Sequence, residues 1–369
     1  MAKNKKTQTP FKIVISELLD ASKPFSPTNL HRFSDIDPAD LAALRINWSK
    51  VDTERRVHLL EDLEDLVDTD TLVSFDDLAR FAMEDPEARV RAVAIRLLWE
   101  TNDLNLIPTF ATMMKNDTDE MVRAGAAGAL GLFVFLGELE EIEKIHYQTV
   151  YDALLAVFRG QDKPVVRRRA LEALGYSSKD EVPAIIEESY ASRDRDWQAS
   201  ALFAMGRSAD ERWAGHILAK LDSSDDDVQL EAVRAAGELE LDKACKPIMD
   251  LLKNPSEVDF ELKSAAVWSL SQIGGKGVRE KLERMSENAE DEDESFFIDE
   301  ALDNLDFKEG TGALGIMNVT PLIDEDHTHI VDLARENDDE DEDLEFGIAE
   351  NLEDEEEEGD DNPLYGSKN

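Results

Sequence analysis

Alanine and larger apolar residues recur through the middle of the chain with the spacing of one helix face. Six segments place an apolar residue four positions before an alanine, and most add a small or apolar pair one turn later. Positions i, i+4, i+7 and i+8 share one face of a helix, and a small residue at its centre lets a neighbouring helix approach closely. The pattern therefore predicts six helices that pack between repeats through Ala94, Ala126, Ala170, Ala201, Ala232 and Ala266.

The spacing of these alanines indicates a repeat. Consecutive alanines lie 32, 44, 31, 31 and 34 residues apart. A second helix is predicted to follow each alanine helix, because Pro108, Pro183 and Pro247 occur where a first helical turn tolerates proline. Such a helix pair cannot bury its apolar face alone, so the units must stack into an all-α solenoid of helix-turn-helix repeats. Helix N-caps are expected at Asp85, Asp117, Asp162, Asp194 and Asp225.

The order of aspartate, Val-Arg, paired alanines, Ala-Leu-Gly and a proline-started second helix resembles a known repeat family. Over residues 81–285 it is similar to the HEAT-like repeats of phycobilin lyase subunits and of many uncharacterised bacterial proteins. The resemblance implies a right-handed α-solenoid. It also implies that the arginine after the valine pairs with an aspartate of a neighbouring repeat, which gives Arg91, Arg123 and Arg167 a structural role. Phycobilin lyases bind a bilin and a partner subunit, but no residue of this chain marks a bilin pocket.

The chain divides into three regions on this pattern. Residues 1–50 are an N-terminal segment and cap, residues 51–307 are the solenoid, and residues 308–369 are an acidic tail that is predicted to be mostly disordered. An apolar island at 313–323 interrupts the tail. We expect the island either to lie against the last repeat or to bind a partner.

Charge is concentrated at the C-terminal end. The formal net charge is −44, and residues 286–369 carry 32 acidic and 3 basic side chains. Such acidic blocks repel one another and bury too little apolar surface to fold. A free nucleic-acid binder would present a basic face instead, so direct binding to nucleic acid is not expected. The tail either keeps the protein soluble or docks on a basic partner or on the array's own arginines.

The apolar segments are too short or too interrupted to target a membrane. The run from Phe11 to Leu19 contains charged residues, and the longest uncharged stretch, Ala124 to Gly137, has 14 residues where about 20 are needed. The single cysteine, Cys245, cannot form an intramolecular disulfide. These features predict a cytoplasmic protein, and a capped array needs no second copy, which favours a monomer.

Two local departures from the repeat are candidates for partner binding. The longest alanine spacing holds about a dozen extra residues around 137–147, and insertions in a solenoid often touch partners. His146 and Tyr147 are the candidate contacts there, and the alternative interpretation is two lengthened helices joined by a slightly longer turn. The other candidates are Arg168 and Arg169, which lie in the only dense basic cluster of the array and could bind an anionic group.

No recognised catalytic, cofactor-binding or metal-binding motif is present. The six histidines form no His-Glu-x-x-His pattern, and the chain has no Cys-x-x-Cys pair or phosphate-binding loop. HEAT-like repeats do form one di-iron enzyme, deoxyhypusine hydroxylase, through His-Glu dipeptides, but this chain has none. His327 and His329 lie beside acidic residues and could hold a metal only adventitiously, since the tail offers no rigid support for the ligands. No catalytic residue, cofactor or metal ligand is assigned.

The leading functional hypothesis is a non-enzymatic scaffold or adaptor. It would bind a protein or peptide in a concave groove lined by the second helices of the repeats, and the negative charge favours a partner with a basic surface. One alternative is an accessory subunit of a lyase-like or other enzyme. Another is an assembly chaperone that uses the acidic tail to hold basic clients.

Overall fold

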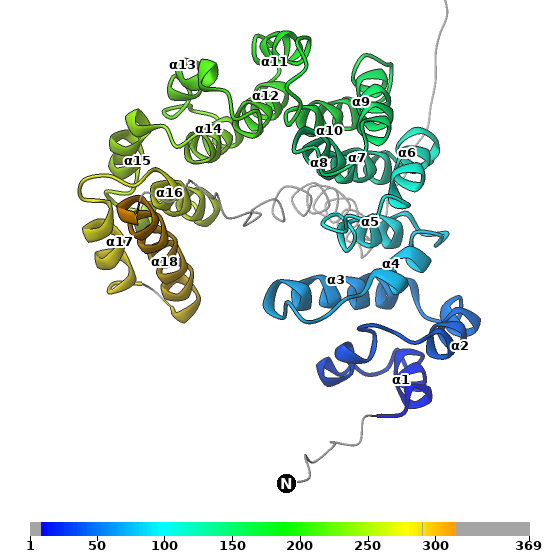
Figure 1. Ribbon diagram of the computed structural model, residues 1–369. Coiled ribbons are helices and arrows are strands. Elements are labelled where there is room, and N and C mark those ends of the chain that lie inside the picture. The colour runs from blue at the N-terminus through cyan, green and yellow to red at the C-terminus, as the bar shows by residue number, and fades with distance from the viewer. Residues whose placement is uncertain (1–8, 290, 315–369) are drawn as a thin grey trace, which may run out of the picture. The chain divides into compact units, whose positions relative to one another are not determined.

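The computed structural model describes residues 9–289 and 291–314, and this part of the chain is built from helices without any strand (Figure 1). All of these residues belong to one compact unit. The acidic tail beyond residue 314, most of the apolar island, and both His327 and His329 lie outside the described residues.

One row of helices contains every repeat alanine, and we call it the alanine row. Each of its helices packs against the next one along the chain, as Figure 1 also shows. The row consists of α3 (Thr53–Thr69), α5 (Ala88–Arg96), α7 (Glu120–Ala129), α10 (Pro164–Leu174), α12 (Arg195–Arg207), α14 (Asp226–Glu238), α16 (Phe260–Ile273) and α18 (Glu292–Leu314).

A second row covers one side of the alanine row. It consists of α4 (Asp76–Ala82), α6 (Leu106–Asn116), α9 (Lys144–Phe158), α11 (Val182–Tyr190), α13 (Ala214–Leu218), α15 (Cys245–Leu251) and α17 (Val278–Ser286). Each of these helices packs mainly on the alanine-row helix that follows it, not on the one before it. This corrects the predicted grouping, in which each proline-started helix completed the preceding unit. The period of a sequence repeat gives the unit length but not where the unit begins.

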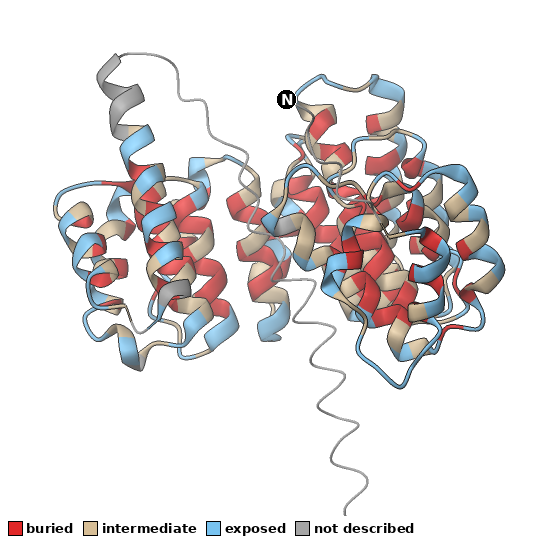
Figure 2. Cartoon of the chain, turned by 90° about the horizontal axis from the view of Figure 1, so that it is seen from below, coloured by how far each residue is buried: buried red, intermediate tan, exposed pale blue. Residues whose placement is uncertain are grey.

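Small residues allow the alanine row to pack tightly. All six repeat alanines have no exposed surface, and Figure 2 shows buried residues concentrated on the helix sides that face other helices. The clearest close approach is between α10 and α12, where a Cβ built on Gly175 would lie 2.7 Å from the Ala204 Cα. Gly175 follows α10 in ordinary helical geometry, so this glycine is required for the close contact and not for a turn.

The insertion predicted near residue 137 is two lengthened helices. The alanine-row helix α7 continues at Leu130 into α8 (Gly131–Glu138), and α9 has 15 residues. The turn between them spans residues 139–143 and exposes Leu139, as well as Ile145 just beyond it. The segment Glu120–Glu138 is long and apolar enough to cross a membrane, but 61% of its most apolar window is buried inside the protein, as in a core helix.

The two ends of the array are closed by different elements. At the N-terminal end are α1 (Phe11–Leu18), the 3₁₀ helix η1 (Pro27–Arg32) and α2 (Pro38–Trp48), and the Phe11 and Phe33 rings meet edge to face at 5.6 Å. At the other end, α18 extends to Leu314 and so includes residues that we had assigned to the tail. Lys308 holds this helix by contacting the Glu240 carboxylate and the Gln272 carbonyl. Short 3₁₀ turns also occur at Glu211–Trp213, Asp242–Ala244 and Pro255–Glu257.

Candidate functional site

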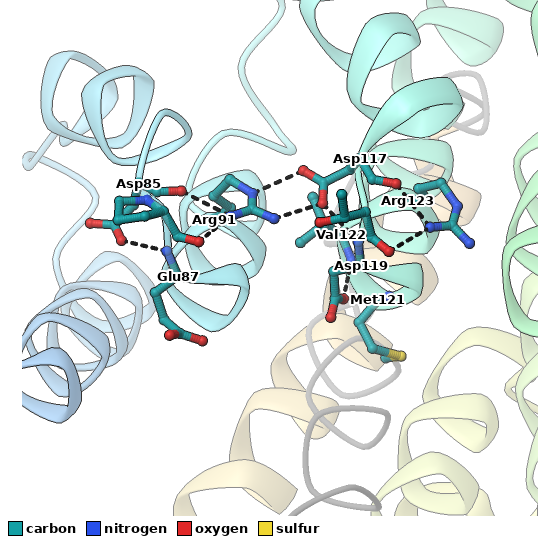
Figure 3. A network of polar contacts seen from close by, with 10 residues as sticks. Asp85, Glu87, Arg91, Asp117, Asp119, Met121, Val122 and Arg123 are labelled. Atoms are coloured by element: carbon teal, nitrogen blue, oxygen red, sulfur yellow. Dashed lines mark hydrogen bonds and ion pairs between the residues drawn. The ribbon is translucent and has the colours of Figure 1, made fainter.

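A row of arginine–aspartate pairs links the first repeats, and we call it the Asp–Arg ladder. Its three pairs are Arg56–Asp85, Arg91–Asp117 and Arg123–Asp162. Arg91 donates two hydrogen bonds to Asp117, of 2.6 and 2.9 Å, and a third to the Asp85 carbonyl in its own turn (Figure 3). Arg123 repeats this geometry with Asp162 at 2.7 and 2.9 Å. The predicted pairing of Arg91 and Arg123 with a neighbouring repeat is present.

The ladder ends at α10. Arg167 donates to the Phe158 carbonyl at 2.8 Å and lies 5.3 Å from the centre of the Trp197 ring, so its role is structural but its partner is not an aspartate. The equivalent residues in the next two repeats are Gln198 and Gln229, which donate to the carbonyls of Ser192 and Leu221. An amide keeps the bond to its own turn and loses the charged link to the next repeat. The ladder therefore stabilises the first half of the array.

Three of the predicted N-caps serve the ladder instead. Asp194 and Asp225 do cap their helices, since each side chain accepts a backbone N–H from the first turn. Asp85, Asp117 and Asp162 lie in the preceding turn, where each accepts an arginine. The capping aspartates and the ladder aspartates lie at nearly the same number of residues before the repeat alanine. The sequence alone therefore does not distinguish the two roles, whereas the structure does.

The predicted anion-binding residues Arg168 and Arg169 both pair with carboxylates of the protein, and Arg169 is buried. Arg169 is 6% exposed and pairs with Glu172 at 2.7 Å, while Glu172 accepts a hydrogen bond from Ser200 at 2.5 Å. Arg168 pairs with Asp196 of the next repeat at 3.0 Å. Arg168 therefore links two repeats directly and Arg169 does so through Glu172, while their role in partner binding stays a prediction.

The structure separates the other two predicted contacts. Tyr147 is buried, and its ring packs against Gly137. A Cβ at position 137 would overlap this ring, so the glycine leaves the room that the tyrosine needs. Its hydroxyl contacts Glu138 and lies 2.7 Å from the Ser177 Oγ, and burial followed by the Glu138 contact raises the tyrosine pKa. His146 is half-buried at the start of α9. Tyr147 thus fixes α9 to its neighbours and offers no surface to a partner.

We call the side of the alanine row that the second row does not cover the open side. It carries aromatic residues that the sequence pattern did not single out. Phe135 in α8 and Tyr176 just after α10 meet with ring centres 5.4 Å apart. The Arg207 guanidinium lies 5.5 Å from the centre of the Tyr176 ring and 5.0 Å from the centre of the Phe203 ring. Arg207 and Phe203 both belong to α12. All four side chains are half-buried. We call Phe135, Tyr176, Phe203 and Arg207 the aromatic strip.

Near the strip, one arginine of α14 is shared between two carboxylates. Glu231 is 1% exposed and pairs with Arg234 at 3.0 Å, and Arg234 also reaches Glu261 at 2.8 Å. Burial, only partly offset by Arg234 and reinforced by Glu172, raises the pKa of Glu231 to about 7. The Glu231 carboxyl group is therefore protonated more readily than a free glutamic acid.

The aromatic strip escaped sequence reasoning because its members occupy different positions in their repeats. Tyr176 and Arg207 each lie six residues after a repeat alanine, whereas Phe203 lies two after and Phe135 nine after. Residues two, six and nine positions after one point of a helix turn toward the same broad side. A search for half-polar faces of the alanine helices would have found them.

Within the described ranges, no three histidine, cysteine, aspartate or glutamate side chains are grouped closely enough to hold a metal ion.

Known structures resemble the chain at low sequence identity. The Escherichia coli protein YibA is 16% identical over 77% of this chain and 98% of its own, with a TM-score of 0.39. Human deoxyhypusine hydroxylase is 15% identical over 80% of this chain and 96% of its own, with a TM-score of 0.33. Yeast importin-beta is 12% identical over 80% of this chain, which spans 46% of importin-beta, with a TM-score of 0.39.

No curated protein matches the chain in sequence. The model of the HEAT repeats does match, over residues 75–175 and 214–303, which together make up more than half of the chain. The matched residues contain the Asp–Arg ladder from Asp85 onward and most of the stacked helices described above. The chain belongs to the HEAT repeat family.

Proposed function

We propose that this protein is a scaffold that binds a protein or peptide partner on the open side of the alanine row. The aromatic strip carries this proposal. Aromatic side chains and arginine contribute most of the energy at many protein interfaces, because they bury a large area at a small entropic cost. A surface of half-buried aromatic rings that is not covered by the second row is suited to that use.

The packing of the two rows supports this choice of side. Alanine-row helices meet each neighbour through alanine and glycine, whereas second-row helices contact one another far less. Closer spacing on one side of a stack curves the stack toward that side, as in other helical solenoids. The concave groove that we proposed from the sequence would then be lined by the alanine row and not by the proline-started helices.

Affinity capture from native lysate tests the proposal. The bait is the full chain, compared with a Phe203→Ala variant that removes the central ring of the aromatic strip. The matched control is Phe296→Ala, which removes a 66% exposed aromatic ring on α18, away from the strip. Circular dichroism melts of all three proteins establish that each is folded.

The scaffold proposal requires a partner that is captured by the wild type and by Phe296→Ala and is depleted several-fold with Phe203→Ala. Equal capture by folded Phe203→Ala would place the binding surface elsewhere.

A further inference from the structure

The last helix of the alanine row exposes two aromatic rings on one side. Phe296 is 66% exposed and Phe307 is 51% exposed. They lie 11 residues apart in α18, which is three helical turns or about 16 Å, so both belong to the same side of the helix. The opposite side is buried against α16 and α17 through Ile298, Ala301 and Leu305. We call the side with Phe296 and Phe307 the outer face of α18.

The outer face is only partly suited to water. A terminal repeat of a solenoid needs a polar outer face, because no further repeat covers it. Glu300 and Asp303 supply exposed charge between the two rings, but the rings themselves add a large apolar area. Two copies of the chain that joined through this face would bring their carboxylates together, which is unfavourable. An uncharged apolar segment fits the outer face better.

The chain supplies such a segment directly after α18, beyond the described residues. Residues 310–323 contain no charged side chain, and an acidic block follows them. Gly315 comes directly after the last residue of the helix, where glycine commonly lets a chain reverse its direction. In an extended chain alternate side chains point to opposite sides, so Met317, Val319 and Pro321 would share one side. That side would be entirely apolar.

We propose that residues 315–322 turn back along α18 and cover its outer face. Phe307 lies seven residues, or about 10 Å, before the end of the helix, and Phe296 lies 18 residues, or about 27 Å, before it. The seven residues after Gly315 span about 23 Å when extended, which carries the segment past Phe307 and close to Phe296. Because the segment is joined to the helix, its effective concentration is about millimolar, and weak apolar contacts are sufficient to hold it. The chain thus closes this end of its own array.

Hydrogen exchange of the full-length protein tests the inference, with exchange of α14 as the internal reference. Val319→Asp places a charge on the apolar side of the segment, and α18 should then exchange at least about fivefold faster. The matched control is Leu344→Asp, which makes the same change in the acidic tail outside the segment and should leave α18 unchanged.

A second variant identifies the surface that the segment contacts. Phe307→Ala removes one ring of the outer face, so adding Val319→Asp to it should change the exchange of α18 by less than about twofold. Residues in contact give such non-additive effects, whereas independent sites give additive ones.

Equal exchange of α18 in Val319→Asp and Leu344→Asp would overturn the inference. So would an undiminished effect of Val319→Asp in the Phe307→Ala background. Protection of α18 that rises with protein concentration would assign the outer face to a second copy instead. None of these results bears on the scaffold proposal, because that proposal depends on Phe203 and is tested by capture of a partner.

Discussion

At the scale of single residues, the Glu231 carboxylate makes the stability of the array depend on pH. Its pKa of about 7 lies above the ordinary value of 4.5. At pH values between these two pKa values, Glu231 is therefore protonated in the folded protein and ionised in the unfolded chain. Stability from this residue falls as the pH rises from about 4.5 to about 7, and the loss is complete above that range.

A Glu231→Gln variant should lose this part of the pH dependence. Glutamine keeps the size of the side chain without the charge, so the variant should gain stability over the wild type between about pH 5 and about pH 8. The shift of the folded pKa limits this gain to about 3 kcal/mol. Urea unfolding of both proteins at the two pH values measures it. A difference between the proteins that does not change with pH would refute the role given to Glu231.

The glycines of the alanine row differ in what an added methyl group would meet. A Gly175→Ala methyl would lie 2.7 Å from the Ala204 Cα and 2.9 Å from its carbonyl oxygen, so α10 and α12 would have to separate. We expect a loss of about 1–3 kcal/mol. Gly128→Ala in α7 meets nothing within 4 Å and should stabilise the protein by about 0.5–1 kcal/mol, since alanine favours the helix. The same sign for both changes in urea unfolding would contradict the close packing.

At the scale of helices, the Asp–Arg ladder joins repeats through charges that water screens poorly. The side chains of Arg91 and Asp117 are 12% and 10% exposed. The side chains of Arg89 and Glu54, which also form a pair, are 45% and 57% exposed. Burial alone would raise the pKa of Asp117, but hydrogen bonds from Arg91 and the Asp119 N–H lower it overall. The ladder is therefore charged at neutral pH, and the stability from Asp117 is lost only as the pH falls below the pKa of free aspartate and through the lower pKa of the folded protein.

Asp117→Asn should loosen the contact between α5 and α7. Asparagine can still accept the Asp119 N–H, but it leaves the Arg91 guanidinium without its charged partner, which should cost about 1–3 kcal/mol. Hydrogen exchange should show faster opening of α5 and α7, with α14 and α16 unchanged because distant repeats share no contacts. Glu54→Gln is the control, and breaking its exposed pair should cost less than about 1 kcal/mol. Similar exchange in both variants would contradict the ladder's role.

The sequence predicts most of the helices but few of the contacts between repeats. The repeat alanines and Pro108, Pro183 and Pro247 identify helices because those signals act within one helix. The pairing of helices, the burial of Arg169 and the glycine space around Tyr147 depend on side chains about 30 residues away or on another helix. Arg167 shows the limit clearly. It occupies the ladder position, yet it contacts Phe158 and Trp197 in place of an aspartate.

At the scale of the whole molecule, the two halves of the array present different chemistry. The Asp–Arg ladder ties the first repeats together from α3 to α10. Phe203 and Arg207 of the aromatic strip lie on α12, the first helix in which glutamine replaces the ladder arginine. In a repeat protein each unit contacts only its neighbours, so one region can be specialised for stability and another for recognition.

The central claim is that partners bind on the open side of the alanine row, and site-directed photo-crosslinking tests it most directly. A photoreactive phenylalanine analogue is placed at position 203 in the aromatic strip or at position 145 in the second row, where Ile145 is 64% exposed. Each protein is irradiated in native lysate. We predict a discrete crosslinked partner from position 203 and none from position 145. A partner captured only from position 145 would contradict the account and assign recognition to the second row.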